Sequence, residues 1–214
     1  GCVILRDAIP SGPLEPINAE LTPWLKGRSD VPDAFPADFQ AAPESIRRQL
    51  INLLQGPWIA QDVVQNLGTW SGRGWEARPN GTWWLQHREP QPRGSTALHL
   101  DYPVHADKSD WFTIWMPFVD CGPTTAPCLD LIPSKMQRPL LFQEHSDFSR
   151  YINPVSSDTA FRYFSPHRIR PDFKPGDLLV FSSCTIHGTF NDPSLAARRS
   201  SFDCRFQLGP SLPV

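Results

Sequence analysis

The sequence predicts a mostly β domain with helices flanking its N-terminal side. From Thr69 onward, short apolar or aromatic runs are separated by Gly, Pro and Asn, a texture typical of antiparallel sheets. The 24 prolines fall mostly between these runs, as expected where connections cross from one sheet to another. The first third of the chain instead carries apolar residues at helical spacing. These observations favour a jelly roll or β-sandwich that follows a helical segment.

Length and composition favour one domain over residues 1–214. A chain of 214 residues with 40% hydrophobic composition can bury one sizeable core and is short for two full domains. We expect the helical part at about residues 13–68 and the barrel at about residues 69–208. No internal repeat is visible.

The helical part is expected to follow a short strand at residues 2–5. A first helix is predicted by apolar residues that recur every three or four positions: Leu14, Ile17, Leu21 and Leu25. A second amphipathic helix begins at Glu44 and ends before Gly56, and residues 58–68 continue the helical pattern.

The strands of the barrel are expected between turn-forming segments. A hairpin over residues 75–87 is predicted by Asn80-Gly81, because this dipeptide readily adopts the two positive φ values of a tight primed turn. The other predicted strands are residues 111–118, 128–132, 178–185 and 199–208, and the predicted long loops are residues 123–127 and 134–174.

Charge and cysteine usage limit the classes of binding partner and the compartment that we expect. The formal net charge is -2, and Lys and Arg are scattered, which argues against a nucleic-acid or anionic-membrane surface. No apolar run approaches the length of a membrane span. Five cysteines without the paired spacing of zinc sites fit a reducing compartment. We expect a cytoplasmic protein that binds a small molecule, with no nucleic-acid or membrane partner; the oligomeric state is not predicted.

A candidate metal site is formed by His99, Asp101 and His187. His99 and Asp101 are two positions apart, so in an extended segment both side chains point to one face. His187 follows the apolar run of residues 178–186, where a strand end meets a loop. Two histidines and one carboxylate on one side of Fe(II) leave positions open for a cosubstrate and dioxygen. A lone His-x-Asp or strand-end His is usually structural, so the assignment depends on further residues.

The predicted last strand supplies such residues. Polar and apolar side chains alternate along it: Arg199, Ser201, Asp203 and Arg205 on one face, and Phe202, Cys204 and Phe206 on the other. The polar face could be exposed to solvent or could line an interior pocket. In a pocket, the Arg199 guanidinium beside the Ser201 hydroxyl would bind one carboxylate of a dicarboxylic acid.

In order and spacing, these segments resemble the phytanoyl-CoA dioxygenase-like branch of the Fe(II)- and 2-oxoglutarate-dependent oxygenases. The resemblance covers nearly the whole chain. Its segments are the opening strand and helix, residues 98–101, 115–120, 129–134 and 174–181, His187-Gly188-Thr189, and Arg199-x-Ser201-x-Asp203-x-Arg205-Phe206. It implies a double-stranded β-helix, that is, a jelly-roll or cupin-like barrel, with Fe(II) as the metal and 2-oxoglutarate and O2 as cosubstrates.

The resemblance also implies residue roles. His99, Asp101 and His187 would bind iron, and Arg199 with Ser201 would anchor the distal carboxylate of 2-oxoglutarate. Two further residues, Thr189 and Trp115, would line the cosubstrate site. Arg198 competes with Arg199 for the anchor, but it shares the strand face of the apolar Phe202 and Phe206, so we prefer Arg199.

Two other assignments remain open. His105-Ala106-Asp107 repeats the His-x-Asp pattern, but it lies closer to the segment at Trp115 than the resemblance requires, so we favour His99 and Asp101. His105 then becomes a residue of the pocket mouth or an exposed loop histidine. Gln86 is a weaker candidate for the proximal end of 2-oxoglutarate, and an ordinary strand residue is the competing interpretation.

The resemblance implies hydroxylation or desaturation of a small-molecule substrate, with decarboxylation of 2-oxoglutarate to succinate. Asp101 stands where related halogenases have a small residue that leaves room for halide, so chlorination is not expected. The alternatives are a cupin-like metal-binding protein, another metalloenzyme with the same ligands, or a non-catalytic jelly-roll binding module. Arginines at 138, 150, 162, 168 and 170 would meet an anionic substrate or simply face solvent, and a coenzyme A ester is not inferred.

Overall fold

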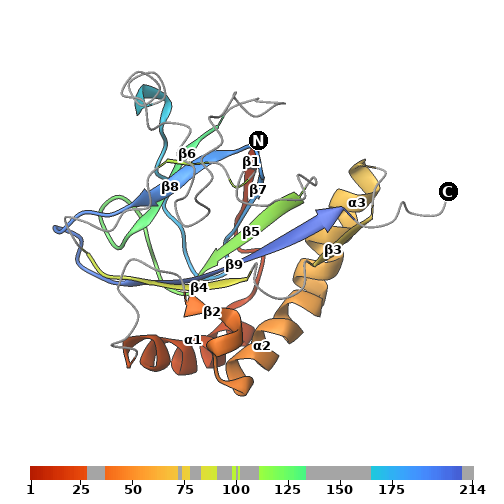
Figure 1. Ribbon diagram of the computed structural model, residues 1–214, viewed down its shortest axis with the longest axis horizontal. Coiled ribbons are helices and arrows are strands. Elements are labelled where there is room, and N and C mark those ends of the chain that lie inside the picture. The colour runs from red at the N-terminus through yellow and green to blue at the C-terminus, as the bar shows by residue number, and fades with distance from the viewer. Residues whose placement is uncertain are drawn as a thin grey trace, which may run out of the picture.

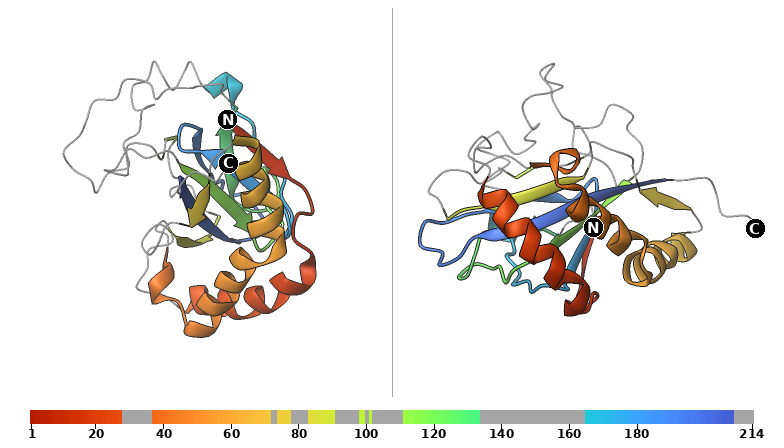
Figure 2. Two further views of the ribbon diagram at one scale, coloured as in Figure 1. Left: turned by 90° about the vertical axis from the view of Figure 1, so that its right-hand side faces the viewer. Right: turned by 90° about the horizontal axis from the view of Figure 1, so that it is seen from below.

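The computed structural model describes residues 1–27, 37–71, 74–77, 83–90, 98–99, 101, 111–133 and 165–208, and the statements below concern these residues. They form three layers: a small sheet, a large sheet and a layer of helices (Figure 1). Seen from below, the helices lie in front of the strands of the large sheet (Figure 2, right). The arrangement confirms the prediction of a mostly β fold with helices from the first third of the chain.

The helices form where the apolar spacing predicts them. Helix α1 (Ser11–Lys26) buries its four leucine and isoleucine positions, and Pro13 lies in its first turn, where a missing N–H costs no helical hydrogen bond. Helix α2 (Glu44–Gln55) buries a similar stripe: Ile46, Leu50, Leu53 and Leu54. The helical extension after Gly56 is also confirmed, as the π-helical segment η2 (Pro57–Gln65) followed by α3 (Asn66–Ser71).

The large sheet is antiparallel throughout. Its strands lie in the order β1-β7-β5-β9-β4-β2, with β3 also paired to β9. Their bounds are β1 Cys2–Leu5, β2 Ala37–Asp38, β3 Trp75–Ala77, β4 Trp84–Arg88, β5 Trp111–Pro117, β7 Leu178–Ser182 and β9 Arg199–Leu208. The small sheet pairs β6 (Cys128–Ile132) with β8 (Ile186–Phe190). Short 3-10 turns lie at Phe39–Ala41 and Ser165–His167.

The two faces of the large sheet differ in polarity. The face toward the helices is apolar and includes Leu85, Ile114, Met116, Val180, Phe202, Cys204 and Phe206 in the main core. The opposite face packs a second core against the small sheet around Trp115, Leu129, Leu179 and Phe181. Because side chains alternate along a strand, the polar residues of β9 lie on this second face, between the sheets.

The predicted hairpin over residues 75–87 is wrong. Strand β3 pairs with β9 from Trp75 opposite Leu208, and β4 pairs with the same strand from Trp84 opposite Asp203. The two segments therefore lie end to end along β9 instead of beside each other. A ten-residue strand offers both of them backbone partners, and such long-range pairing leaves no local signal in the sequence. The Asn80-Gly81 dipeptide lies outside the described residues.

The predicted strand over residues 178–185 is too long. Strand β7 ends at Ser182 and is followed by a turn that leads into β8. In this turn the Thr185 amide donates a hydrogen bond to the Ser182 carbonyl at 2.9 Å. The turn contains Ser183 and Cys184 and no Gly or Pro, so the sequence does not mark it. His187 consequently lies inside β8, in the small sheet. Of the predicted loop at 134–174, residues 134–164 lie outside the described part.

Gly176 shows why a glycine stands at the turn before β7. Its φ is +100°, and a Cβ atom there would lie 2.4 Å from the carbonyl oxygen of Ile9. The neighbouring Asp177 accepts hydrogen bonds from the backbone amides of Asp7 and Lys174, both at 3.0 Å. The turn thus ties the entry to α1 to the start of β7.

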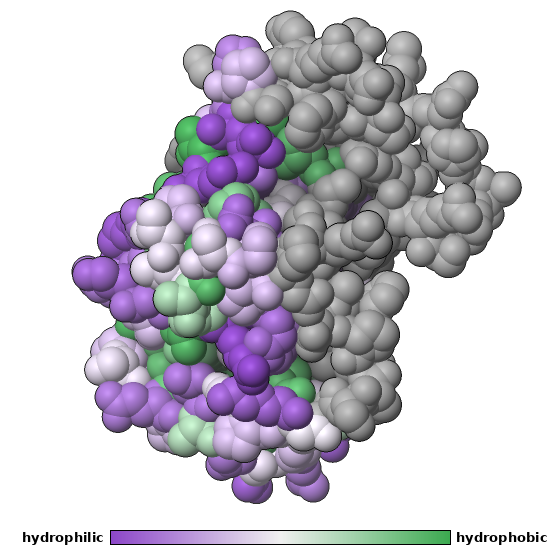
Figure 3. Space-filling view, turned by 90° about the vertical axis from the view of Figure 1, so that its left-hand side faces the viewer, coloured by the Kyte–Doolittle hydropathy of each residue, from purple (hydrophilic) through white to green (hydrophobic). Residues whose placement is uncertain are grey.

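The described surface is mixed in polarity. Figure 3 shows hydrophilic side chains over much of one face, with smaller apolar groups between them. The large hydrophobic side chains exposed in the described part are Val3 and Ile169. None of the described helices combines the length and the apolar character that crossing a membrane requires.

Candidate metal centre and anion site

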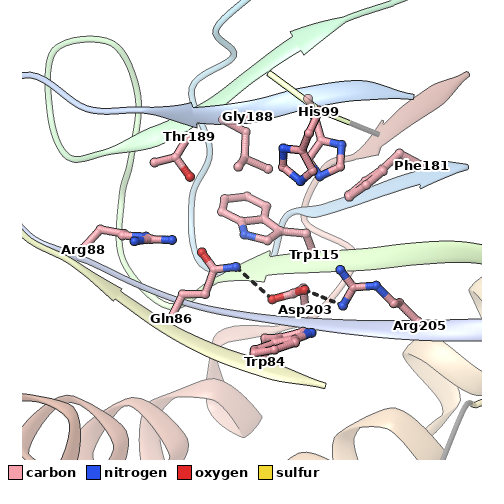
Figure 4. A pocket seen from close by; sticks show the side chains of 12 residues that line it. Trp84, Gln86, Arg88, His99, Trp115, Phe181, Gly188, Thr189, Asp203 and Arg205 are labelled. Atoms are coloured by element: carbon pink, nitrogen blue, oxygen red, sulfur yellow. Dashed lines mark hydrogen bonds and ion pairs between the residues drawn. The ribbon is translucent and has the colours of Figure 1, made fainter. Parts of the chain in front are cut away.

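The candidate site lies between the two sheets. A pocket there is lined by residues from β4, β5, β6, β7, β8 and β9, together with His99: Trp84, Gln86, Arg88, Trp115, Leu129, Phe181, His187, Gly188, Thr189, Asp203 and Arg205. In Figure 4, Gln86, Asp203 and Arg205 lie along the large sheet, and His99 and Thr189 face them from the other side. The face alternation of β9 thus turns Asp203 and Arg205 toward the pocket. Arg199 and Ser201 lie on the same face and are fully buried, but they are not among the described residues that line the pocket.

The structure brings the three predicted metal ligands together. The Oδ1 atom of Asp101 lies 3.8 Å from Nε2 of His99 and 3.9 Å from Nε2 of His187. One ligand atom from each residue lies within 4.8 Å of the other two, and all three side chains are buried. Backbone hydrogen bonds in both directions between His99 and His187, at 2.8 and 3.0 Å, fix the first histidine against β8. Two imidazoles and a carboxylate at this spacing fit a divalent transition metal.

The second ring nitrogen of His187 sets its orientation. Nδ1 lies 3.0 Å from the carbonyl oxygen of Thr185, which can only accept, so Nδ1 carries the proton and Nε2 keeps its lone pair. Burial lowers the pKa of His187, although Asp101 opposes this effect. The imidazole is therefore held neutral with Nε2 toward the metal position, as a ligand requires.

Arg199 is fully buried, and its hydrogen-bond acceptors among the described residues are neutral. Its Nη2 donates to the amide oxygen of Gln86 at 2.9 Å, and its Nη1 donates to the carbonyl oxygen of Pro127 at 3.4 Å. Among the described residues its Nε has no hydrogen-bond partner, and neither has the buried hydroxyl of Ser201. Burial lowers the pKa of this guanidinium. A buried guanidinium with neutral acceptors is suited to binding an anion, because burying a charge is costly unless an opposite charge compensates it.

The thiols near Arg199 do not supply that anion. Burial raises the pKa values of Cys121 and Cys128 to about 12, so both stay protonated at neutral pH. Arg198 is not in this site: its side chain is half exposed and forms an ion pair with Glu89. Arg199 faces inward as the alternation along β9 predicts, whereas Arg198 lies before the strand and does not share the buried face of Phe202 and Phe206. The role of Arg199 as the anchor stays a prediction.

The other predicted residues are placed as follows. Thr189 and Trp115 both line the pocket, and the Arg199 guanidinium carbon lies 5.6 Å from the centre of a Trp115 ring. Gln86 also lines it and contacts Arg199. His105, Asp107 and the arginines at 138, 150 and 162 lie outside the described residues, while Arg168 and Arg170 form ion pairs with Asp130.

Sequence reasoning missed a role for Arg88, Asp203 and Arg205. Arg88 is 3% exposed, lines the pocket and lies opposite Arg199. Arg88 follows Trp84 and Gln86 at intervals of two residues, so the alternation along a strand could have placed all three side chains on one face. Arg205 lies 3.1 Å from Asp101 and 3.0 Å from Asp203, and burial raises the pKa of the Asp203 carboxyl to about 6.

Comparisons with known proteins identify the fold. No protein-family model matches the chain, and no curated protein matches it. One similar solved structure is the epimerase SnoN in complex with Fe3+, alpha-ketoglutarate and nogalamycin RO, with a TM-score of 0.70 and 16% identity over 97% of this chain and 78% of that one. AviO1 from Streptomyces viridochromogenes Tue57 has a TM-score of 0.67 and 12% identity over 100% of this chain and 92% of that one. The non-haem alpha-ketoglutarate-dependent carbocyclase SnoK has a TM-score of 0.65 and 15% identity over 100% of this chain and 89% of that one.

These similarities confirm the predicted fold class, the double-stranded β-helix in its jelly-roll form, with helices on the outer face of the large sheet. At 12 to 16% identity they establish the fold and leave the reaction to be argued from the site. They do not assign the chain to the phytanoyl-CoA dioxygenase-like branch.

Proposed function

We propose that this chain is an Fe(II)- and 2-oxoglutarate-dependent oxygenase that acts on a small molecule. The observation that carries the proposal is the combination of two features between the two sheets: the facing ligand atoms of His99, Asp101 and His187, and the buried Arg199, whose acceptors in the described part of the chain are neutral. A site for a metal alone does not need the second feature. A dicarboxylate cosubstrate needs both.

The protein's part in such a reaction follows from its residues. His99, Asp101 and His187 would hold the metal through three ligand atoms, and Arg199 with Ser201 would bind the distal carboxylate of the cosubstrate. Thr189 and Trp115 would border the cosubstrate between these ends. When bound, iron and 2-oxoglutarate supply the oxidation of a substrate C–H bond with release of succinate and carbon dioxide.

The finer assignment is hydroxylation or desaturation, in a protein of the phytanoyl-CoA dioxygenase-like branch that works in the cytoplasm. The buried Asp101 supports hydroxylation or desaturation over chlorination, because its carboxylate occupies the position that a halide would need. The similar structures include an epimerase and a carbocyclase, so the same fold supports other outcomes. A chlorinated product from the purified protein would contradict the assignment.

A cupin-like metal-binding protein or another metalloenzyme with the same three ligands is the competing function. The discriminating observation is Arg199, since a metal hydrolase has no use for a buried carboxylate anchor. The competing function predicts metal binding with no effect of 2-oxoglutarate.

The test is succinate formation from 2-oxoglutarate by metal-depleted protein, with and without added Fe(II). We expect iron-dependent succinate in the wild type, none in His187→Ala, and a requirement for at least about tenfold more 2-oxoglutarate in Arg199→Ala, since a charged hydrogen-bonded pair is lost. Arg198→Ala is the matched control, because Arg198 directly precedes β9 and its side chain is half exposed, and the variant should behave as wild type. Equal 2-oxoglutarate requirements in both arginine variants would contradict the anchor assignment.

A further inference from the structure

The two oxygens of the Asp101 carboxylate have different surroundings. Oδ1 faces the Nε2 atoms of the two histidines, at 3.8 and 3.9 Å. Oδ2 accepts one hydrogen bond from the hydroxyl of Thr113 and one from Nη2 of Arg205, both at 3.1 Å. One oxygen is thus presented to the metal position, and the other is held by the protein.

Arg205 is itself fixed by a second carboxylate. Its Nη1 donates to Oδ2 of Asp203 at 3.0 Å, so one guanidinium bridges the two acids. Gln86 in turn donates from Nε2 to Oδ1 of Asp203 at 3.1 Å, and its Oε1 accepts from Arg199 at 2.9 Å. Figure 4 shows the contacts of Asp203 with Gln86 and Arg205 as dashed lines. A continuous chain of side chains therefore joins the metal ligand Asp101 to the anion site.

We propose that Arg205 is a positioning residue that holds Asp101 so that it binds the metal through Oδ1 alone. This inference rests on the proposed function, because it presumes a metal at the three ligands. Arg205 reaches Asp101 from β9 across 104 positions of sequence, and its side chain is about one tenth exposed, so solvent weakens the ion pair little.

The way in which Asp101 binds the metal decides how many coordination positions around the metal stay open. A carboxylate that binds through both oxygens occupies two positions, whereas one that binds through a single oxygen occupies one. A chelating cosubstrate and dioxygen together need three positions beside the three protein ligands. By engaging Oδ2, Arg205 and Thr113 keep that third position from being filled by the protein's own carboxylate.

The test compares metal affinity and coordination in Arg205→Met, Arg205→Lys and the control Arg198→Met, an exposed arginine of the same strand region. Co(II) serves as the probe, with its affinity measured by competition against a chelating dye and its coordination by visible absorption. Loss of such an outer hydrogen bond weakens metal binding by about 10- to 100-fold. We expect a loss of this size with a changed Co(II) spectrum in Arg205→Met, partial recovery in Arg205→Lys, and wild-type behaviour in Arg198→Met.

The outcomes separate the two proposals. Wild-type Co(II) affinity and spectrum in both Arg205 variants would overturn the positioning role and leave the proposed function standing. Failure of the wild type to bind metal, or binding unaffected by His187→Ala, would instead overturn the proposed function. If Arg205→Met does not fold, by circular dichroism, Arg205→Lys decides the question, because lysine keeps the charge but has one nitrogen in place of the fork whose Nη1 and Nη2 contact different acids, and the affinity should fall measurably.

Discussion

Arg88 and Arg199 lie directly opposite each other on the neighbouring strands β4 and β9, with exposed fractions of 3% and 0%. Like charges in directly opposite positions destabilise a sheet, and burial increases their cost. We expect an anion bound between the sheets to lower this cost. Anion binding should then raise the stability of the protein, an effect that can be measured without metal or turnover.

Dicarboxylate binding should therefore stabilise the metal-free protein. At a concentration of 2-oxoglutarate one hundred times its Kd, the free energy of unfolding should rise by about 2.7 kcal/mol. Arg199→Met should abolish the effect and Arg198→Met should keep it, as followed by urea unfolding. A rise of equal size in both variants would contradict an anion site at Arg199.

Replacing Gln86 should show whether the anion site tolerates an internal carboxylate. Gln86→Glu would place a charge 2.9 Å from Nη2 of Arg199, where it competes with the cosubstrate, and close to Asp203. We expect its Kd for 2-oxoglutarate to rise by about tenfold or more. Gln86→Leu, which removes the hydrogen bonds without adding charge, should raise the Kd less. The reverse order, measured by calorimetry, would argue against binding at Arg199.

Asp203 should give the metal-free protein a pH-dependent stability. Burial raises the pKa of its carboxyl from 3.8 to about 6, although Arg205 opposes the rise. Between these values the folded state binds more protons than the unfolded state, so its contribution to the free energy of unfolding falls as the pH rises from about 4 to about 6. A pKa rise of this size corresponds to about 3 kcal/mol.

Asp203→Asn removes this titration. The stability of the wild type relative to the variant should therefore decline from pH 4 to pH 7, by urea unfolding of the two metal-free proteins. Titration of carboxylates distant from Asp203 is common to both proteins and cancels in the difference, whereas Asp101, which shares Arg205 with Asp203, is part of the measured effect. A difference that stays constant with pH would show that Asp203 titrates normally.

The helical layer should contribute stability without touching the site. Leu21 of α1 is fully buried on the outer face of the large sheet, and Leu21→Ala should cost about 2–5 kcal/mol in urea unfolding. Val3→Ala, at a position 48% exposed, should change the stability by about 0.5 kcal/mol or less. Metal affinity should be the same in both folded variants, and a lower affinity in Leu21→Ala would contradict the separation of core and site.

The sequence predicts those features that have a local pattern. The buried stripes of α1 and α2 follow from 3.6-residue spacing, and the inward position of Arg199 rather than Arg198 follows from the alternation along β9. The pairing of His99 and Asp101 follows from their spacing of two. In each case the periodicity of one element decides which side chains share a face.

Features that depend on long-range contacts were not predictable in this way. Pairing of β3 and β4 with β9 depends on a strand more than a hundred positions away, and the predicted hairpin fails for that reason. The contact between Arg205 and Asp101 spans 104 positions, so no pattern around either residue reveals it. The turn that places His187 in β8 uses serine and cysteine, which carry a weak turn signal.

The central claim is that one interior site binds Fe(II) and 2-oxoglutarate together. The most direct measurement is an anaerobic titration of Fe(II) into the protein with 2-oxoglutarate present, followed by the visible absorbance of the chelate. We predict absorbance that saturates at one iron per chain, is absent in His187→Ala, and needs more 2-oxoglutarate in Arg199→Met. Folded, iron-loaded wild type without this absorbance would contradict the claim and favour a cupin-like metal-binding protein.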